Sequence, residues 1–501
     1  MTSSTPIDRV YLDTKELTAF GRDDAHTPLL PGVQDLRLAE QQRRRTRVRR
    51  LCHLAFLTTL LVFAVHLLAD TVRYQTARVL GLDSDPEAMA MNDHEYPIPE
   101  GVALVDCPAW EISEDARVGR ASFQFALPAH ELFALARGPR SHGAIWVRQS
   151  DDATDDVRVN VEMRSDSPTG FDHAKACLAR RAGDEDTAGL GIFTKHWWDE
   201  PRHLHTQFAI ELVLPKRAGD EVLQVHNLTT DLPIFKHTIA DLADTVLFES
   251  LTLRTTDASI YTQSLHAHQA SILTTNAAID GTYLADAHLA LRTANGRIAA
   301  IATAATLDAA TANGAIEGAY TARRALALVT QNAHIHATFA LENDDPAGPP
   351  ARAKLQTTNG QIRAAGDLSV ADSPAFTSTA TPSFAIDAHT TNGALALDLL
   401  AAPLDSALAL DAHTTMGRAD VRLPPTYEGA FDARTSLARV HVQPQDGGEG
   451  GGEGGGRGRR AVRLERNTAN HVRGTVGWSE EGRKRGQARV SSQMGAVSLW
   501  V

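Results

Sequence analysis

Apolar and polar residues alternate in short segments that fill the chain from about residue 250 to its end. Leu251 and Leu253 stand four and two residues before Thr255, and Ile260 stands five residues after it. The same spacing recurs around later threonines. Alternation with a period of two on both sides of a short break predicts a strand, a turn and a second strand, each with one buried face.

The break between the two strands is a recurring hexapeptide. Thr293 to Ile298 reads Thr-Ala-Asn-Gly-Arg-Ile, and Thr311 to Ile316, eighteen residues later, reads Thr-Ala-Asn-Gly-Ala-Ile. Related hexapeptides begin at Thr255, Thr274, Thr330, Thr357, Thr390, Thr414, Thr435 and Ser492. The first five copies are 19, 19, 18 and 19 residues apart. Self-similarity at a fixed short period predicts stacked rungs, and the Asn-Gly pairs argue against helices.

Two columns of this repeat predict specific contacts. The fifth position after each Thr is expected to be buried: Ile260, Ile279, Ile298, Ile316, Ile335, Ile362, Leu395, Ala419, Val440 and Val497. The second position holds Asn276, Asn295, Asn313, Asn332, Asn359 and Asn392. At a rung spacing of ~4.8 Å these amides are expected to form a ladder, which should lapse where Met416, Leu437 and Met494 replace Asn. Asn and Gly also tolerate the positive φ that a tight corner is expected to require.

Leu-Pro pairs indicate that strands begin upstream of the repeat. They occur in the segments 125–128, 212–215 and 421–424. After the middle pair, the spacing predicts that Leu223, Val225 and Asn227 face inward before a corner. It predicts the same of Leu232 and Ile234 after the corner. The pattern predicts a β-rich part over 100–250, with long loops at about 150–205, followed by repeats over 251–501.

The Thr-x-Asn-Gly-x-Ile copies and the Leu-Pro strand openers resemble the putative-adhesin family of β-strand repeats, found in bacteria. Similar domains occur in fungal single-pass membrane proteins. The resemblance covers about residues 210–500. It implies a β-helix-like solenoid with a surface role, and it carries over no catalytic residue. The expected fold class is all-β: a β-solenoid ectodomain with repeats of ~18–21 residues.

An uncharged apolar run precedes this β-rich part. Residues 51–69 contain no Asp, Glu, Lys or Arg, and as a helix they would span roughly 28 Å, close to the ~30 Å hydrocarbon core of a bilayer. Six arginines among residues 43–50 predict that the N-terminus stays in the cytosol. A buried soluble helix is the alternative, because His53 and His66 weaken the hydrophobicity.

The parts of the chain on the two sides of this predicted span differ in length and charge. Residues 1–50 are expected to be a disordered cytosolic tail, 51–69 a transmembrane helix in contact with the lipid bilayer, and 70–99 a juxtamembrane stalk. The C-terminal domain would then be extracellular or lumenal. The first fifty residues carry a net charge of +3 and the rest carry −15, out of −12 in total. This acidic remainder argues against a nucleic-acid partner.

A Gly/Glu linker interrupts the late repeats. Residues 447–456 consist entirely of Gly and Glu, and a basic stretch follows over 457–466. The segment from about 444 to 468 is expected to be a disordered insertion. The alternative for its basic part is a site for polyanions.

Two features outside the repeat have chemical interest. Cys107 and Cys177 are the only cysteines outside the apolar run, and they form either one disulfide in an oxidising lumen or two buried thiols. Asn227 begins the only Asn-x-Thr sequon and is therefore a candidate glycosylation site, although its predicted register points inward.

The sequence offers little catalytic chemistry. Asp280 and Glu317 fall in one outward column two rungs apart, roughly 10 Å, with Ala299 between them, which makes a poor acid pair. The histidine pairs 203/205, 266/268 and 334/336 lack a third ligand at a fixed spacing. His196 to Asp199, which reads His-Trp-Trp-Asp, is either a binding loop or packing at the end of the solenoid. No catalytic, cofactor-binding or metal-binding residue is therefore predicted.

These observations predict a non-enzymatic single-pass membrane protein. Its adhesin-like β-solenoid would serve structural or binding roles toward a glycan, a cell-wall polymer or a protein. Two alternatives remain at this stage: a carbohydrate-active enzyme built on a β-helix, and an accessory subunit of a membrane complex.

Overall fold

The computed structural model describes residues 96–501 except for eight short gaps: 128, 154, 196–204, 218, 220, 346–347, 372–380 and 446–459. These residues form 29 strands and two short 3-10 helices, at Pro168–His173 and Gly482–Lys484. The described part contains no helix long and apolar enough to cross a bilayer. The predicted tail, the apolar run at 51–69 and the stalk up to residue 95 lie outside the described residues.

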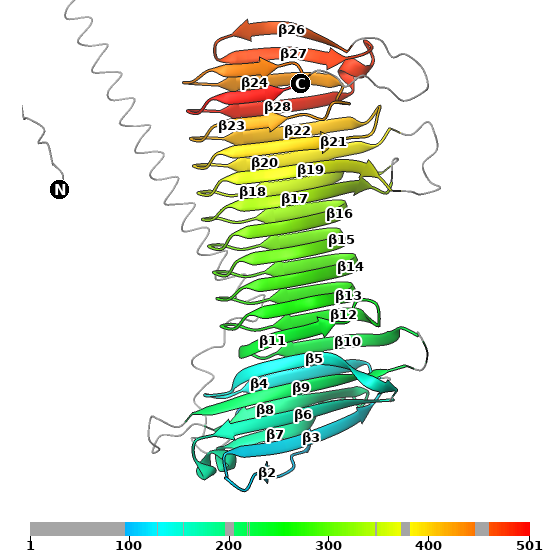
Figure 1. Ribbon diagram of the computed structural model, residues 1–501, viewed down its shortest axis with the longest axis vertical. Coiled ribbons are helices and arrows are strands. Elements are labelled where there is room, and N and C mark those ends of the chain that lie inside the picture. The colour runs from blue at the N-terminus through cyan, green and yellow to red at the C-terminus, as the bar shows by residue number, and fades with distance from the viewer. Residues whose placement is uncertain are drawn as a thin grey trace, which may run out of the picture. The chain divides into compact units, whose positions relative to one another are not determined.

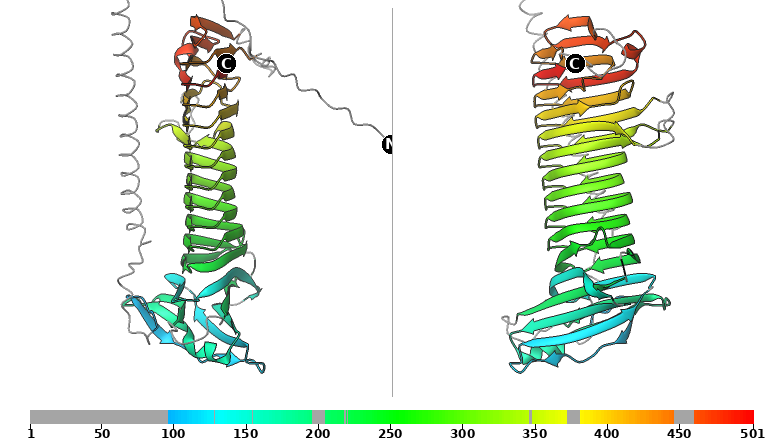
Figure 2. Two further views of the ribbon diagram at one scale, coloured as in Figure 1. Left: turned by 90° about the vertical axis from the view of Figure 1, so that its left-hand side faces the viewer. Right: turned by 45° about the vertical axis from the view of Figure 1, so that its right-hand side comes forward.

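Two sheets face each other along an elongated stack (Figures 1 and 2). Sheet 1 holds the strands that follow each corner. In spatial order these are β2 (Glu111–Ile112), β3 (Val118–Ala126), β6 (Asp156–Ser165), β9 (Thr206–Lys216), β5 (His142–Ala153), β11 (Ile234–Asp241), the first halves of β13 (Ile260–Leu273), β14 (Ile279–Arg292), β15 (Ile298–Ala310) and β16 (Ile316–Val329), then β17 (Ile335–Asn343), β19 (Ile362–Val370), β21 (Leu395–Ala401), β23 (Ala419–Arg422), β29 (Val497–Trp500) and β25 (Val440–Gln443).

Sheet 2 holds the strands that precede each corner. In spatial order these are β1 (Val102–Asp106), β7 (Ala174–Arg181), β8 (Thr187–Thr194), β4 (Glu131–Arg137), β10 (Leu223–Asp231), β12 (Val246–Arg254), the second halves of β13 to β16, then β18 (Ala351–Gln356), β20 (Ser383–Thr390), β22 (Ala407–Thr414), β28 (Gly486–Ser492), β24 (Gly429–Thr435), β27 (His471–Gly477) and β26 (Ala461–Thr468). The central strands pair in parallel, each with the next rung, and the end strands β1, β3, β26 and β27 pair antiparallel.

The predicted all-β fold is confirmed, and so is the buried column. All ten aliphatic residues five positions after the repeat Thr or Ser are buried, from Ile260 to Val497. They belong to one hydrophobic cluster that continues from the repeats into the N-terminal strands. Burial of each Ile or Leu contributes ~1.5–3 kcal/mol, so small aliphatic layers suffice to hold the stack together. The parallel rungs are consistent with a β-solenoid.

The corners are held by the repeat's polar residues. The buried Thr311 hydroxyl accepts the Gly314 N–H at 3.1 Å and donates to the carbonyl of Gly296, one rung away, at 3.0 Å. The Asn side chains form the ladder: each amide from Asn295 to Asn392 donates to the previous Asn carbonyl at 2.6 Å. Beyond it, Met416, Met494 and Leu437 are exposed.

The sequence predicts that the corner Asn and Gly residues adopt a positive φ, and this prediction is wrong. Among the described residues, no Asn of the column and no corner Gly has a positive φ. A Cβ at Gly314 would lie 1.7 Å from the carbonyl oxygen of Gly296, and one at Gly393 would lie 1.8 Å from that of Gly360. Glycine is therefore needed because neighbouring rungs approach closely, and not because the corner requires a left-handed backbone.

The order of rungs in space differs from their order in the chain at both ends. The rung of β4 and β5 lies between that of β8 and β9 and that of β10 and β11. Near the other end, β28 and β29 are inserted between β22 and β23 on one side and β24 and β25 on the other. The last residues of the chain thus lie inside the stack, where Val501 is buried.

Three predicted boundaries are corrected. The segment 150–205 was expected to be loops, but it holds β6, β7 and β8, whose alternating residues pack into the same core. The insertion at about 444–468 was expected to be disordered, but 461–468 is β26, which pairs with β27 because the end of sheet 2 offers an open edge. After the corner at Leu232, Ile234 is 46% exposed and Phe235 is buried, so the predicted register is wrong by one residue.

This register places a histidine in the core. His237 is fully buried, its Nδ1 donates to the Phe235 carbonyl at 2.9 Å, and its Nε2 accepts the Thr230 hydroxyl at 2.9 Å. Burial lowers the pKa of His237 to about 4, although the bond to Phe235 acts in the opposite direction. The imidazole is therefore neutral near pH 7.

We expect His237 to make the fold acid-sensitive. The unfolded chain binds this proton near pH 6.5 and the folded chain only near pH 4, so the free energy of unfolding should fall by ~3 kcal/mol as pH drops through that window. The free energy of unfolding, measured with denaturant at about pH 7.5 and pH 4.5, should fall by roughly 2–3 kcal/mol less in His237→Gln than in the wild-type chain. Equal falls in both proteins would contradict this assignment.

Candidate functional site

A groove lies on the outer face of sheet 1, toward the C-terminal end of the stack. It has a volume of about 380 Å³. Small residues stand at outward positions on three successive strands there and leave the sheet surface hollow: Thr338 on β17, Ala365 on β19 and Ala396 on β21. Larger side chains surround this floor: His336, Arg363, Asp398, Asp420, Arg422 and Trp500. We call this site the C-terminal groove.

Parallel pairing brings these residues together from distant parts of the chain. His336 on β17 is the register neighbour of Arg363 on β19. Asp398 on β21 neighbours Arg422 on β23, which in turn neighbours Trp500 on β29. The insertion of β29 beside β23 therefore delivers the only tryptophan of the groove.

Ion pairs organise one side of the groove. A guanidinium nitrogen of Arg422 lies 3.2 Å from a carboxylate oxygen of Asp398, and the Nε of Arg418 lies 2.9 Å from a carboxylate oxygen of Asp420. The Arg422 guanidinium also lies over the Trp500 ring, 5.6 Å from its centroid, and the Trp500 indole N–H donates to Gln443 at 2.9 Å. The indole is thus held in a defined orientation and is half-buried.

A second groove, which we call the N-terminal groove, lies on the same outer face near the other end. It has a volume of about 440 Å³ and is lined by Arg120, Ser122, Trp146, Asn160, Glu162 and Glu211. Trp146 is 43% exposed. The pKa of Glu211 is lowered by hydrogen bonds from Asn160, at 3.0 Å, and from Arg148, at 2.7 Å. This carboxyl is therefore held in its charged form.

Asp280 and Glu317, the acid pair that the sequence offers, lie in one outward column, as the repeat predicts. Asp280, Ala299 and Glu317 are successive neighbours on β14, β15 and β16. Each acid has its own basic partner: Asp280 lies 2.9 Å from Arg297, and Glu317 lies 3.0 Å from His334. With Ala299 between them and a separate partner for each, the two carboxylates do not converge on one point, as the acid pair of a glycosidase must.

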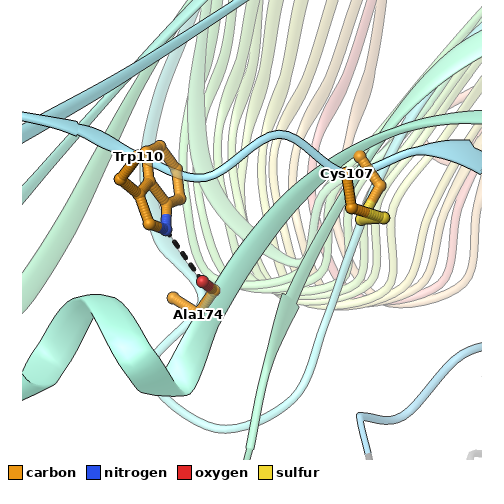
Figure 3. The surroundings of a disulfide bond; sticks show 4 residues. Cys107, Trp110 and Ala174 are labelled. Carbon is orange, nitrogen blue, oxygen red and sulfur yellow. Dashed lines mark hydrogen bonds between the residues drawn. A yellow bond between two sulfur atoms is a disulfide. The ribbon is translucent and has the colours of Figure 1, made fainter.

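A disulfide joins Cys107 to Cys177, with Cα atoms 4.2 Å apart (Figure 3). Nearby, the Trp110 indole N–H donates to the Ala174 carbonyl at 2.8 Å. The segment 96–107 covers a small apolar cluster on the outside of sheet 2, formed by Phe133, Leu135, Cys177, Ala179 and Phe193. The bond thus ties the first described segment to the end of the stack.

We expect the double variant Cys107→Ser, Cys177→Ser to lose ~2–4 kcal/mol of unfolding free energy, because the bond closes a long loop. Thermal unfolding would measure the loss, and limited proteolysis should show earlier cleavage within 96–107. The wild-type chain treated with reductant is the matched control and should behave like the variant. Unchanged stability and cleavage in both would contradict the role given to this bond.

The remaining predicted residues lie apart from the grooves. Asn227 does not point inward: it is half-buried within β10, and its amide donates to the His130 carbonyl at 3.2 Å. His266 lies 3.1 Å from Asp286. Within the described ranges no cluster of three or more His, Cys, Asp or Glu side chains suits a metal ion. The His-Trp-Trp-Asp segment at 196–199 and His203 lie outside the described residues.

Sequence reasoning missed Trp146 and Trp500. Trp500 lies eight residues after Ser492, in an outward column that also contains Ala365, Asp398 and Arg422. Along that column, from β17 to β29, small residues are followed by charged residues and then by Trp500. Trp146 carries no such signal, because its strand has no Thr-x-Asn-Gly corner.

No family model matches this chain, and no curated protein matches it significantly. Two solved structures are similar to it. One is described as a putative cell adhesion protein from Clostridium sporogenes ATCC 15579, with 7% identity, coverage of 76% of this chain and 99% of that chain, and a TM-score of 0.13. The other is described as a putative adhesin from Bacteroides fragilis NCTC 9343, with 10% identity, coverage of 76% and 97%, and a TM-score of 0.17. At these TM-scores neither likeness supports a conclusion about fold or function.

Proposed function

We propose that this chain is a non-enzymatic binding protein whose stack presents the C-terminal groove to a glycan. The groove itself carries the proposal: a hollow of about 380 Å³ with an oriented tryptophan beside alternating Arg and Asp side chains. An indole packs against the apolar C–H face of a sugar ring, while planar guanidinium and carboxylate groups hydrogen-bond its hydroxyls. A parallel sheet supplies the rigid support that such a site needs.

The arrangement of the acidic residues in the groove supports binding over turnover. Glycoside hydrolysis needs one carboxyl that keeps a proton and a second that faces the same bond. Asp398 and Asp420, in the groove, each lie within ion-pair distance of an arginine. An arginine beside each carboxylate holds its oxygens in place as hydrogen-bond acceptors for the hydroxyls of a ligand.

A binding assay with matched variants tests this proposal. The full chain, purified in detergent, is applied to an array of cell-surface and cell-wall glycans. Trp500→Ala should weaken retention at least ~10-fold, because buried aromatic contacts dominate such interfaces. Tyr261→Ala is the control, since Tyr261 is 48% exposed on the same outer face and lies outside the groove. Absence of any retained glycan, or equal losses in the two variants, would refute the proposal.

We further propose that the stack is displayed on the non-cytosolic side of a membrane. The uncharged run at 51–69 and the arginines at 43–50 support this orientation. In sealed vesicles that carry the full chain, external protease should degrade the tail and leave a protected C-terminal fragment if the vesicles keep the cytosolic side outward. Complete digestion of the C-terminal domain in such vesicles would contradict it.

A further inference from the structure

Resting on the proposed function, we propose that the C-terminal groove selects a linear acidic polysaccharide that runs along the axis of the stack. One sugar carboxylate would lie at Arg363, and a sugar ring further along the same chain would pack against Trp500.

The charges of the groove point to an anion at Arg363. The other arginine that lines the groove, Arg422, lies 3.2 Å from Asp398, and the nearby Arg418 lies 2.9 Å from Asp420. Among the described residues, Arg363 has no acidic side chain within ion-pair distance, and it is exposed. Its register neighbour His336 is also exposed and adds a second nitrogen donor group. A guanidinium with a free planar edge matches a carboxylate with two parallel hydrogen bonds.

The spacing of the strands favours a sugar chain that lies along the stack. Neighbouring strands lie ~4.8 Å apart. This is close to the length of one pyranose unit in an extended β-1,4-linked chain, so successive sugars can contact equivalent positions on successive strands. A peptide strand, at ~3.4 Å per residue, would lose this register within a few residues. From β17 to β29 there are four strand steps, which is ~19 Å or about four sugars.

The floor of the groove leaves room for such a chain. Between Arg363 and Trp500, small residues occupy two outward positions, Ala365 and Ala396. The charged side chains that also stand there are held by ion pairs, Asp398 with Arg422 and Asp420 with Arg418. Sugar hydroxyls between the two ends can accept hydrogen bonds from the exposed guanidinium of Arg422. Trp500 supplies stacking for any sugar, acidic or neutral, and Arg363 supplies the preference for a carboxylate.

A pair of probes with the same backbone tests this assignment. Hexamers of β-1,4-linked mannuronate and of β-1,4-linked mannose differ only in the carboxylate at C6, and the glucuronate and glucose hexamers form a second such pair. Binding of each probe to the full chain is measured by titration calorimetry. At least one acidic hexamer should bind about 10-fold more tightly than its neutral partner. Arg363→Gln should abolish that difference, because it weakens binding of the acidic hexamer about 10-fold more than binding of its neutral partner, whereas Arg352→Gln, on the outer face of sheet 2, should change neither affinity.

The outcomes separate this inference from the proposed function. If neutral and acidic hexamers bind equally and Trp500→Ala weakens both, the groove binds glycans and the selection for acidic sugars is wrong. If acidic hexamers bind more tightly but Arg363→Gln leaves the preference intact, the assignment to Arg363 is wrong. If no hexamer binds and Trp500→Ala changes nothing on the array, the proposed function fails and the inference fails with it.

Discussion

Ile298→Lys should unfold the central rungs, whereas Ala299→Lys should leave them intact. Ile298 is completely buried between the two sheets, and a lysine there would place an unpaired charge in the apolar core at a cost of at least ~4 kcal/mol. Ala299 is the next residue and points outward between Asp280 and Glu317, where a lysine meets two acids. Circular dichroism and limited proteolysis measure the difference.

The pair of variants isolates the direction of the side chain, since the two positions are adjacent and the substitution is the same. A rung contacts mainly its neighbours in a stack, so damage at Ile298 should spread outward from β15 and need not abolish all structure. Similar resistance to protease in both variants would contradict the alternation on which the fold depends.

Truncation after Arg485 should destabilise the C-terminal end of the stack far more than the loss of sixteen terminal residues suggests. The truncation removes β28 and β29, which lie between two other rungs. Direct stacking of the remaining rungs would bring Phe431 against Leu410, where the native structure places Ala488 between them. Overpacking of this kind opposes closure of the gap. Amide exchange over 429–443 and 461–477 should accelerate about 100-fold, with 260–343 unaffected.

Complementation provides the control for this truncation. A synthetic peptide with residues 486–501, added in trans, should restore slow exchange over 429–443 because it can refill the vacant position between β22 and β24. If the truncated chain kept its native protection without the peptide, the inserted rung would not be essential to the end of the stack.

The repeat was predictable because its determinants are local. In the Asn-Gly corners the Thr hydroxyl accepts the N–H of the Gly three residues later, and the period-two alternation on either side specifies which side chains are buried. The order of the late rungs was not predictable, because the copies at Thr435 and Ser492 present similar corners to any neighbour. The structure places the large Phe431 next to the small Ala488, a match of sizes between rungs that the corner motifs do not encode.

The core histidine and the grooves escaped sequence reasoning for different reasons. Ile234 and Phe235 are both apolar, so alternation alone could not choose the buried one, and the choice of Ile234 moved His237 to the outer face. The C-terminal groove depends on the register between β17 and β29, which lie more than 150 residues apart in sequence. Each of these strands contributes only one or two outward residues, and only the register between rungs shows that they form one groove.

Hydroxyl-radical footprinting of the full chain, with and without a retained glycan, tests the central claim most directly. If the C-terminal groove is the binding site, oxidation of Trp500 and His336 should fall together on binding, although they lie on strands far apart in the sequence. Tyr261 and Trp146, on the same outer face, should keep their reactivity. Protection confined to those two residues, or unchanged oxidation of Trp500 in the presence of a bound glycan, would contradict the account.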